Sequence, residues 1–511
     1  MCNFNTLLYK YVYFLHIIKK TFNLLERYLK QSLHKLQSFA KRKARNLLPI
    51  WVLAANFRQH PLKRLIAMQF QKPKLSFRQI INMNVGFFGI QYSFGLQQSA
   101  VNPIYDMLGA RPDEIPLLNL AGPVTGLLIQ PIIGAMSDKT WHPRWGRRKP
   151  YFFIGALLCS LCLFIYPFSS TLWMAVGLLW VLDAANNTAM EPYRAFIADK
   201  LPPEQMATGF LSQSFFTGLG ITLANVSLFI FQKNITGSLG AIPYWVFGSF
   251  FLGSVCSIAS VSWSMAKTPE IPPTPEELAE LQKEKLSILT PFKEIPAAIM
   301  DMPKVMWQLA LVYLFQWYAL FCYWQNAAKS IAQSAWKTNN YQQNPLYDEA
   351  VGWTGLVNGW YNIVTFLSAF ALVGLAKKYS PKGVHIICLI LAGVGLLIFP
   401  HIEDKYLFFI PMTGFGIAWA SMMGIPYLMV VGNIPKERYG VYMGIINMMI
   451  VIPMILQNIS FGYILKHFLN NDPGKAISFA GVFLLLAAIA TTLIKSAKPT
   501  DTVQMPMGGG H

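Results

Sequence analysis

A succession of apolar runs, each about as long as a membrane is thick, constrains this chain more than any other feature. A helix that crosses the hydrocarbon layer needs about 20 mostly apolar residues, because each backbone amide must be hydrogen-bonded within its own segment. The runs lie at residues 80–108, 115–137, 151–169, 171–198, 207–232, 242–266, 305–333, 351–376, 383–401, 405–432, 439–468 and 475–495. They predict an all-α membrane protein with twelve transmembrane helices.

The composition is that of a protein whose solvent is lipid. Of the 511 residues, 54% are hydrophobic and 13% are charged, whereas about a quarter of the residues of a typical soluble domain are charged. Within the apolar runs, His, Asp, Glu and Ser are not clustered at the spacing of a metal site or a nucleophile. All the cysteines except Cys2 lie in apolar runs, as buried hydrophobes do. We therefore expect no enzymatic activity, no metal and no cofactor.

Most of the positive charge lies at the start of the chain, before the apolar runs. Residues 1–79 contain ten Lys and six Arg against the single acid Glu26, and carry 15 of the 19 net positive charges. The remainder is nearly balanced, so the charge does not indicate nucleic acid as a partner. The leader is either a basic helix on an anionic membrane face or an upstream extension before a start at Met68 or Met83. It lacks the cleavage site of a signal peptide.

One long polar segment separates the sixth apolar run from the seventh. Its sequence is KTPEIPPTPEELAELQKEKLSILTPFKEIP, rich in Pro at first and then amphipathic, which is typical of a linker. The predicted divisions are a basic leader at 1–79, a first six-helix half at 80–266, a cytoplasmic linker at 267–304, a second six-helix half at 305–495 and a cytoplasmic tail at 496–511.

A short internal repeat supports this division. Pro-Tyr at 192–193, at the end of helix 4, recurs as Pro-Tyr at 426–427, at the end of helix 10. Pro-Pro-Glu-Gln at 202–205 then corresponds to Pro-Lys-Glu-Arg at 435–438. Duplication of one six-helix unit explains both matches and the central linker.

The basic loops predict the orientation of the chain, because Lys and Arg in short loops resist translocation. The loops after helices 2 and 8 are the most basic, and their residues are Lys139, Arg144, Arg147, Arg148, Lys149, Lys377, Lys378 and Lys382. We therefore expect both termini on the cytoplasmic side of the cell membrane.

The loop between helices 2 and 3 contains more than a membrane anchor requires. Its characteristic residues are Gly134, Asp138, Gly146, Arg147 and Arg148. A glycine allows two helices to approach closely, and an aspartate at a helix end can pair with an arginine and cap a neighbouring helix. We interpret this segment as a cytoplasmic gate rather than as a substrate site.

Helix 4 contains an acid in the middle of the membrane. If the helix begins near Leu172, Asp183 lies about 16 Å deep, close to the bilayer midplane. A charged side chain is costly there, so we expect Asp183 to face the protein interior, to carry a proton and to serve the function. The alternative is a buried acid that is only hydrogen-bonded to its neighbours. Asn186 and Asn187 follow at i+3 and i+4 on the same face.

The end of helix 4 carries a second group of charges. Arg194 lies about three turns nearer the cytoplasm than Asp183, so we expect it to pair with Glu191, with Asp199 or with the gate loop. The second half has no acid at the position equivalent to Asp183, and helix 2 has none within its apolar run. Because sodium sites need several oxygen ligands, this pattern favours a proton as the coupled ion.

Helices 7 and 8 combine aromatic rings with amides. This combination suits a sugar, because the C–H faces of a sugar pack on aromatic rings and its hydroxyls bind amides. An aromatic belt at the membrane interface is the alternative explanation. The candidate substrate contacts of these helices are Trp317, Tyr323, Gln325, Asn358 and Tyr361.

Four segments of the chain are characteristic of one family: GIQYSFGLQQS (89–99), AGPVTGLLIQPIIGAMSDKTWHPRWGRRKP (121–150), LDAANNTAMEPYRAFIAD (182–199) and GIINMMIVIPMI (444–455). Through them, from about residue 80 to residue 465, the chain resembles the plant sucrose transporters and their animal and bacterial proton–sugar relatives. These proteins belong to the major facilitator superfamily and are similar to the glycoside-pentoside-hexuronide cation symporters.

The resemblance implies alternating access by rocking of the two halves, uptake driven by the proton gradient, and a glucoside such as sucrose or maltose as the substrate. Asp183 matches the acid that couples protons in this family, and Arg194 matches an arginine at the end of helix 4. Gln91 and Gln97 of helix 1 and Asn447 of helix 11 join the candidate substrate contacts through this resemblance.

We therefore expect a monomeric symporter in the cell membrane that imports a disaccharide together with H+. The alternatives are a proton-linked antiporter or exporter of another small molecule on the same fold, and a non-transporting membrane sensor. Two departures from the family leave the exact sugar open: Glu191 replaces a small residue, and helix 7 lacks the acid that the plant members carry.

Overall fold

The computed structural model describes residues 73–138, 140–270, 272, 299–430 and 439–494. The chain divides between residues 71 and 72 into two compact units, and every described residue belongs to the second unit. Most of the predicted leader and linker, the repeat at 435–438 and the tail at 496–511 lie outside the described residues.

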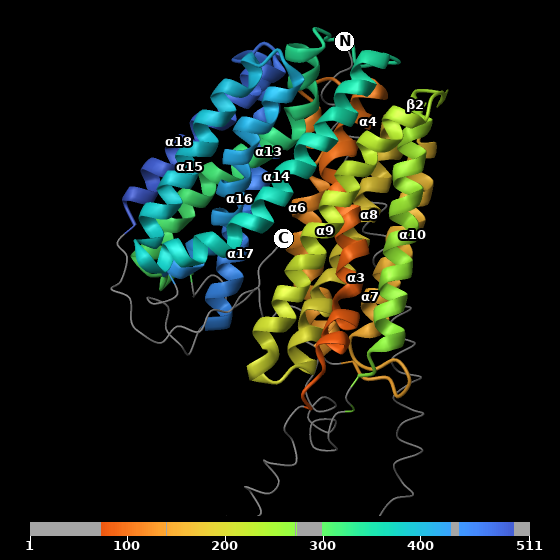
Figure 1. Cartoon of the computed structure of the whole chain (residues 1–511), viewed down its shortest axis with the longest axis vertical. Coiled ribbons are helices and arrows are strands. Elements are labelled where there is room, and N and C mark those ends of the chain that lie inside the picture. The colour runs from red at the N-terminus through yellow and green to blue at the C-terminus, as the bar shows by residue number, and fades with distance from the viewer. Residues whose placement is uncertain (1–72, 139, 271, 273–298, 431–438, 495–511) are drawn as a thin grey trace, which may run out of the picture. The chain divides into compact units, whose positions relative to one another are not determined.

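Long helices occupy all twelve predicted positions in the described part of the chain (Figure 1). They are α3 (Phe77–Leu96) with η1 (Gln97–Val101) and α4 (Asn102–Met107), α5 (Ile115–Leu118) with α6 (Ala121–Asp138), α7 (Lys149–Ile165), α8 (Leu172–Lys200), α9 (Pro203–Asn234), α10 (Tyr244–Lys267), α13 (Lys304–Ala335), α14 (Pro345–Lys378), α15 (Pro381–Ile398), α16 (Phe409–Val430), α17 (Tyr439–His467) and α18 (Pro473–Thr492). Among the described residues, nine helices are long and apolar enough to cross a membrane.

The remaining elements are short connections. The 3-10 turns η2 (Tyr166–Phe168), η3 (Phe399–His401) and η4 (Lys405–Phe408) extend or precede long helices. Between α9 and α10, strands β1 (Ser238–Leu239) and β2 (Ile242–Pro243) form an antiparallel hairpin in which Ser238 pairs with Pro243 and Leu239 with Ile242. These short connections join long helices that follow one another in the chain.

The helices begin where the sequence supplies a cap for their unpaired N–H groups. Ser76 and Gln79 form a capping box at the start of α3, in which each side chain bonds the backbone of the other residue. The side chains of Thr171, Asn344 and Asp472 cap α8, α14 and α18. Such caps satisfy backbone donors that water would otherwise have to satisfy.

The helices pack in two groups with the same internal order. In the first group, α3 packs on α9 and α10, α6 and α7 pack on α8, and α7 also packs on α10. In the second group, α13 packs on α17 and α18, α14 and α15 pack on α16, and α15 also packs on α18. The groups meet where α9 packs on α14 and where α17 packs on α5 and α6. This correspondence is what a duplicated six-helix unit produces.

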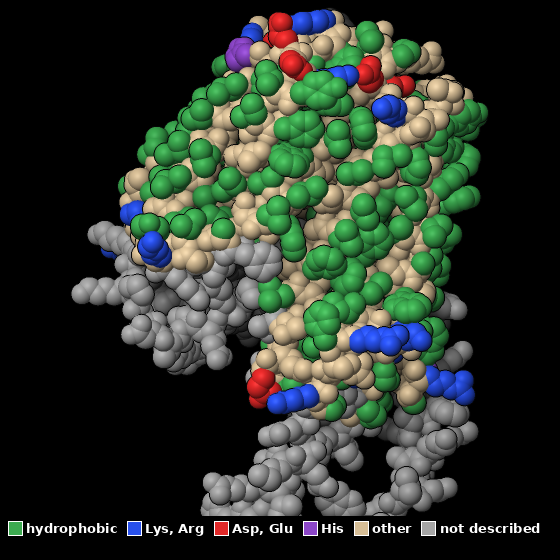
Figure 2. All heavy atoms as spheres, in the orientation of Figure 1, with side chains coloured by type: hydrophobic (Ala, Val, Ile, Leu, Met, Phe, Trp, Pro, Cys, Tyr) green, Lys and Arg blue, Asp and Glu red, His purple; other side chains and the backbone are tan. Residues whose placement is uncertain are grey.

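Apolar side chains cover the outer faces of these helices. Figure 2 shows hydrophobic side chains along the sides of the bundle and charged side chains near its two ends. On α7, Ile154, Leu158 and Leu161 are between 42% and 51% exposed. An apolar surface of this extent is stable in contact with lipid and costly in water.

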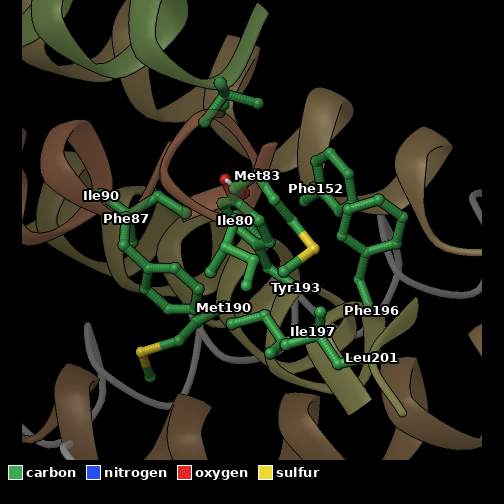
Figure 3. Close-up of a cluster of buried hydrophobic side chains, with 13 residues drawn as sticks. Ile80, Met83, Phe87, Ile90, Phe152, Met190, Tyr193, Phe196, Ile197 and Leu201 are labelled. Carbon is green, nitrogen blue, oxygen red and sulfur yellow. Dashed lines mark hydrogen bonds between the residues drawn. The ribbon is translucent and has the colours of Figure 1, made fainter. Parts of the chain in front are cut away.

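The interior of the first group is built around Tyr193 of α8 (Figure 3). Its ring stacks between Phe87 of α3 and Phe152 of α7, with centroids 4.4 and 4.7 Å away. Its hydroxyl donates to the Met83 carbonyl at 2.6 Å. A Cβ at Gly86 would collide with this ring, so the glycine is what allows α3 to pack so closely on α8. The side chain of Tyr427, its counterpart in the repeat, lies outside the described residues.

Candidate functional site

Asp183 lies buried in the middle of α8, with 4% of its surface exposed. A Cβ on Gly122 of α6 would lie 3.6 Å from the Asp183 carboxylate, so the acid faces the interior of the first half rather than the lipid. The side-chain amide of Gln97 in η1 interacts with the carboxylate, although the Gln97 amide nitrogen completes no hydrogen bond of regular geometry. Within the described residues, Asp183 has no ion-pair partner.

Amide side chains surround this acid. Asn187 donates to the Asp183 carbonyl at 2.9 Å and to the Thr125 hydroxyl at 3.2 Å. The side-chain oxygen of Asn187 accepts a 2.6 Å hydrogen bond from the side-chain amide of Gln130 of α6. Asn186 donates to Ser93 of α3 at 2.9 Å. Asn186 is thus bonded to α3 and Asn187 to α6.

Several buried polar atoms of this group have no hydrogen-bond partner in the described protein. They are the Gln91 Oε1, the Gln97 Nε2 and the Asn186 Oδ1. Buried polar atoms are nearly always paired, so an unpaired one marks a place where a polar ligand can bind. Gln97 interacts with Asp183, and Asn186 lies one turn from it, whereas the Gln91 amide contacts the Met190 sulfur further along α8 at 3.8 Å.

A π-helical turn, η1, brings this region to the second half. Such turns displace side chains from the regular helical register and occur frequently at functional sites. Gln97 at its start interacts with Asp183, while Ser99 accepts a 2.9 Å hydrogen bond from Asn358 of α14. Ser99 also donates to Asn225 of α9. The turn thus contacts the acid on one side and the opposite half on the other.

The candidate contacts of the second half form a connected group beside η1. The hydroxyl of Tyr323 of α13 donates to the side-chain oxygen of Asn358 at 2.8 Å. The indole N–H of Trp324 donates to the Tyr361 hydroxyl at 3.3 Å. Gln325 donates to Asn458 of α17 at 2.8 Å. All these side chains except Trp324 are fully or almost fully buried, so their polar atoms depend on one another for pairing.

Two further predicted contacts are Trp317 and Asn447. Trp317 is buried on α13, and its ring meets Trp419 of α16 edge-on at 5.6 Å, as the ring of Trp324 also does. Asn447 is exposed on α17. Trp360, one of the aromatic residues of helix 8, is 39% exposed and donates to Thr413, in the manner of a side chain at the lipid boundary.

The gate segment joins three helix ends. The Arg148 guanidinium donates to Asp199 of α8 at 2.9 Å and to Ser137 of α6 at 2.7 Å. The Glu270 carboxylate accepts from the backbone N–H groups of Arg147, Arg148 and Lys149 at 2.6 to 3.0 Å, and so caps α7. Asp199 and Glu270 thus supply an arginine partner and a helix cap at this segment. The side chain of Asp138 lies outside the described residues, so the role foreseen for it stays a prediction.

Two further gate residues lie as the sequence predicts. Arg194 approaches Glu191 at 3.9 Å, one of the pairings expected for it. The side chain of Glu191 crosses Gly134 of α6, where a Cβ would come within 3.6 Å of the Glu191 Cγ. A Cβ at this distance would make an ordinary van der Waals contact, so the Glu191 side chain does not by itself require glycine at position 134.

Sequence reasoning missed four polar residues that connect parts of the fold. They are Ser99, Glu270, and Asp106 and Lys329, which form an ion pair. A signal was present for the ion pair, because each of its members is the only charged residue of its apolar run. In the described part of the chain, no three His, Cys, Asp or Glu side chains are grouped so that they could hold a metal ion.

The comparisons with known proteins agree with this architecture. The sucrose transport protein SUT1 of rice (Oryza sativa subsp. japonica) is 24% identical over 503 residues, which cover 83% of this chain and 89% of that protein. The sucrose transport protein SUC3 of Arabidopsis thaliana is 32% identical over 142 residues, 24% of each chain.

Solved structures show the same fold. The nucleoside transporter NupG superimposes with a TM-score of 0.62 at 14% identity, over 82% of this chain and all of that chain. The xylose transporter XylE of E. coli superimposes with a TM-score of 0.57 at 15% identity, over 83% of this chain and 97% of that chain. A family model described as the Major Facilitator Superfamily matches residues 83–458. The chain therefore belongs to the Major Facilitator Superfamily and is a multi-pass membrane transporter rather than an enzyme.

Proposed function

We propose that the protein is a proton-coupled symporter that imports a disaccharide, an α-glucoside such as maltose or sucrose, by alternating access. The observation that carries the proposal is the Asp183 carboxylate, buried among neutral amides without an ion-pair partner in the described residues. An ionised carboxylate in such surroundings is costly, and a bound proton removes that cost. Asp183 is therefore the residue that takes up the proton.

The polar groups around Asp183 support a sugar as the substrate. A sugar hydroxyl can donate a hydrogen bond to the unpaired Gln91 Oε1 and Asn186 Oδ1 atoms. Tyr323 and Tyr361 supply aromatic rings on the opposite half. The matched rice and Arabidopsis proteins are both sucrose transport proteins by name, which favours a disaccharide.

The turn η1 supplies a route from the proton to the movement of the halves. Gln97 can donate to an ionised Asp183 or accept from a protonated one, so its amide must reorient when the proton binds. Ser99, two residues along the same turn, is bonded to Asn358 of the second half. We infer that protonation and sugar binding together change the strength of the Ser99–Asn358 hydrogen bond, and that the halves rock in response.

The proposed arrangement in the cell follows from the basic loops. The gate segment and the linker at 267–304 lie on the cytoplasmic side of the cell membrane, together with both termini, and the α4–α5 connection faces the outside. The working unit is a monomer with a leader at 1–79, two six-helix halves at 80–266 and 305–495, and a tail at 496–511.

Uptake into proteoliposomes tests the proposal. An imposed inward proton gradient should drive accumulation of a labelled disaccharide above the outside concentration, whereas a sodium gradient alone should not. A panel of maltose, sucrose, xylose and a nucleoside identifies the substrate class. Accumulation of the nucleoside but of no disaccharide, or efflux of substrate against proton entry, would contradict the proposal in favour of another transporter of this fold.

The variant Asp183→Asn isolates the coupling step. It should lose accumulation above equilibrium and retain exchange of sugar between the two sides, because the asparagine mimics the protonated acid. Asp472→Asn is the matched control, since Asp472 caps α18 and asparagine caps equally well. Proton-driven accumulation by Asp183→Asn equal to that of the parent protein would sink the assignment.

A further inference from the structure

In the described part of the chain, two ion pairs join the halves: a partly exposed one between Lys466 and Asp113 at 3.7 Å, and one that is almost completely buried. Lys329 of α13 lies 3.2 Å from Asp106 of α4, and each side chain is 2% exposed. Asp106 belongs to the first half and Lys329 to the second. Figure 1 shows α4 at the end of the bundle away from the start of α3, so the pair lies on the face opposite the one where the linker attaches.

A tyrosine of the second half completes the coordination of the acid. The hydroxyl of Tyr347, in the first turn of α14, donates to the other Asp106 oxygen at 2.7 Å, and Tyr347 is 0% exposed. Both carboxylate oxygens of Asp106 are thus bonded by helices of the opposite half. Separation of the halves at this face has to break both bonds.

The loop before α14 covers this group. The ring of Tyr341 packs on Tyr347 with centroids 5.0 Å apart. Gln342 lies over Gly109, where a Cβ would come within 3.0 Å of its amide nitrogen and where the backbone has a φ of +85°. Asn344 orders the loop by bonds to Thr338 and to the start of α14. The covering residues keep the ion pair away from water, which strengthens it.

Weaker contacts between the halves surround the ion pair on the same face. Asn102 of α4 donates to the Trp324 carbonyl at 3.4 Å, and Asn458 of α17 donates to the Asn119 carbonyl at 3.2 Å. A buried ion pair adds little net stability compared with apolar residues of the same shape. The contact between Asp106 and Lys329 nevertheless requires both residues, because removal of one leaves the charge of the other buried without a partner, which is unfavourable.

We propose that Asp106, Lys329 and Tyr347 form a latch that closes the protein on the face opposite the linker and opens once in each transport cycle. These are positioning residues, since they hold the halves and touch no substrate. The proposal rests on the alternating-access part of the proposed function and is independent of the sugar and of the coupled ion. Loss of the latch shifts the resting population toward the state that is open on this face.

Thiol labelling of the purified full-length protein tests the latch without any substrate. Asn102→Cys places a reporter thiol beside the latch at a position that is 5% exposed. The same reporter is introduced into every variant, and its reaction with a maleimide is followed by mass spectrometry of the peptide. Asp106→Asn should accelerate labelling at least about tenfold, because it leaves the Lys329 charge buried and uncompensated.

Restoration of opposite charges should restore closure. The exchanged pair Asp106→Lys with Lys329→Asp should label within about threefold of the parent, since attraction between the halves returns. Tyr347→Phe removes one hydroxyl from a well-packed ring and should accelerate labelling about threefold. If Asp106→Asn is too unstable to purify, the labelling rate of Tyr347→Phe tests the latch instead.

The chain supplies a matched control in an exposed ion pair within the second half. Lys337 lies 2.6 Å from Glu403, with 61% and 76% of the side chains exposed. The hydrogen bond from Lys337 lowers the pKa of the Glu403 carboxyl. Because this pair lies within one half, Glu403→Gln should leave labelling unchanged.

Labelling of a folded Asp106→Asn or Tyr347→Phe variant at the parent rate would overturn the latch. So would an exchanged pair that labels as fast as Asp106→Asn. Failure of disaccharide uptake leaves these rates unaffected, because no sugar and no proton gradient are present in the assay. The two proposals therefore stand or fall separately.

Discussion

Asn358 of α14 donates a 2.9 Å hydrogen bond to Ser99 of η1 and so joins the second half to the turn that contacts the buried acid of the first. Both side chains are buried, at 3% and 4% exposure. Asn358 also accepts the hydroxyl of Tyr323. A single amide thus connects a candidate sugar contact with the turn that contacts Asp183.

The first prediction concerns this amide. Asn358→Leu removes a donor and an acceptor from a buried network and leaves the hydroxyls of Ser99 and Tyr323 without it. We expect the KM for the transported sugar to rise about tenfold or more, which corresponds to roughly 1.4 kcal/mol. Initial rates of uptake into proteoliposomes at several sugar concentrations measure the change.

Thr354→Val is the control for that prediction. Thr354 lies one turn before Asn358 on the same helix, is 2% exposed, and its hydroxyl donates to the Ala350 backbone carbonyl within α14 at 2.7 Å. Its loss should change the KM less than about threefold. An equal rise in KM for both variants would mean that α14 tolerates no apolar residue here and would remove the support for a specific role of Asn358.

The second prediction concerns the unpaired oxygen of Gln91. We expect Gln91→Leu to raise the KM roughly tenfold, because the variant loses an acceptor that the protein leaves free for a sugar hydroxyl. Asn84→Leu is a control on the same helix, since the Asn84 Oδ1 is also unpaired but lies two turns away from Gln91. A KM for Gln91→Leu within twofold of the parent value would exclude Gln91 from the substrate site.

The order of the helices could be predicted from the sequence because apolar length is a local property. The predicted run at 439–468 corresponds to α17 at Tyr439–His467, and the other runs agree within a few residues. Asp183 was equally visible, because a lone acid in the centre of an apolar run has a cost that composition alone reveals. Its close neighbours Asn186 and Asn187 followed from helical spacing.

The connections between distant segments could not be predicted in this way. Asp106 and Lys329 are 223 residues apart, and each lies near the end of its run, where a charge is normally explained by contact with water or headgroups. Their pairing depends on which helix ends of the two halves meet. Glu270 stands at the start of a Pro-rich linker, where an acid is usually solvated, and only the fold brings it to the start of α7.

The third prediction concerns the glycine beside Glu270. Gly146 has a φ of +76°, and a Cβ there would collide with the Glu270 carboxylate. Gly146→Ala should therefore lower stability both through backbone strain and through loss of the α7 cap, by about 2 kcal/mol or more. The midpoint of thermal unfolding of the purified protein measures the effect.

Gly240 separates the two causes. It has a φ of +63° in the β1–β2 turn, but nothing lies within 4 Å of a Cβ built there. Gly240→Ala should therefore show the backbone cost alone, about 1 kcal/mol. If both alanine variants unfold at the same temperature, the contact between Gly146 and Glu270 contributes nothing to stability.

The last prediction separates the gate from the substrate site. The planar Arg148 guanidinium bonds Asp199 of α8 and Ser137 of α6 at the same time, and the side chain is only 6% exposed. A lysine has one compact ammonium and cannot span both partners in this geometry. Arg148→Lys should lower the maximal uptake rate about fivefold or more and leave the KM unchanged, because the gate sets the rate of rocking and not the affinity for sugar.

Arg144→Lys is the control, since Arg144 is an exposed residue of the same loop, and its uptake rate should match that of the parent. A raised KM with an unchanged maximal rate for Arg148→Lys would assign Arg148 to sugar binding. That result would also require the polar region around Asp183 to extend along α8 as far as Asp199. The buried apolar core around Tyr193 lies between Asp183 and Asp199 on α8 and argues against such an extension.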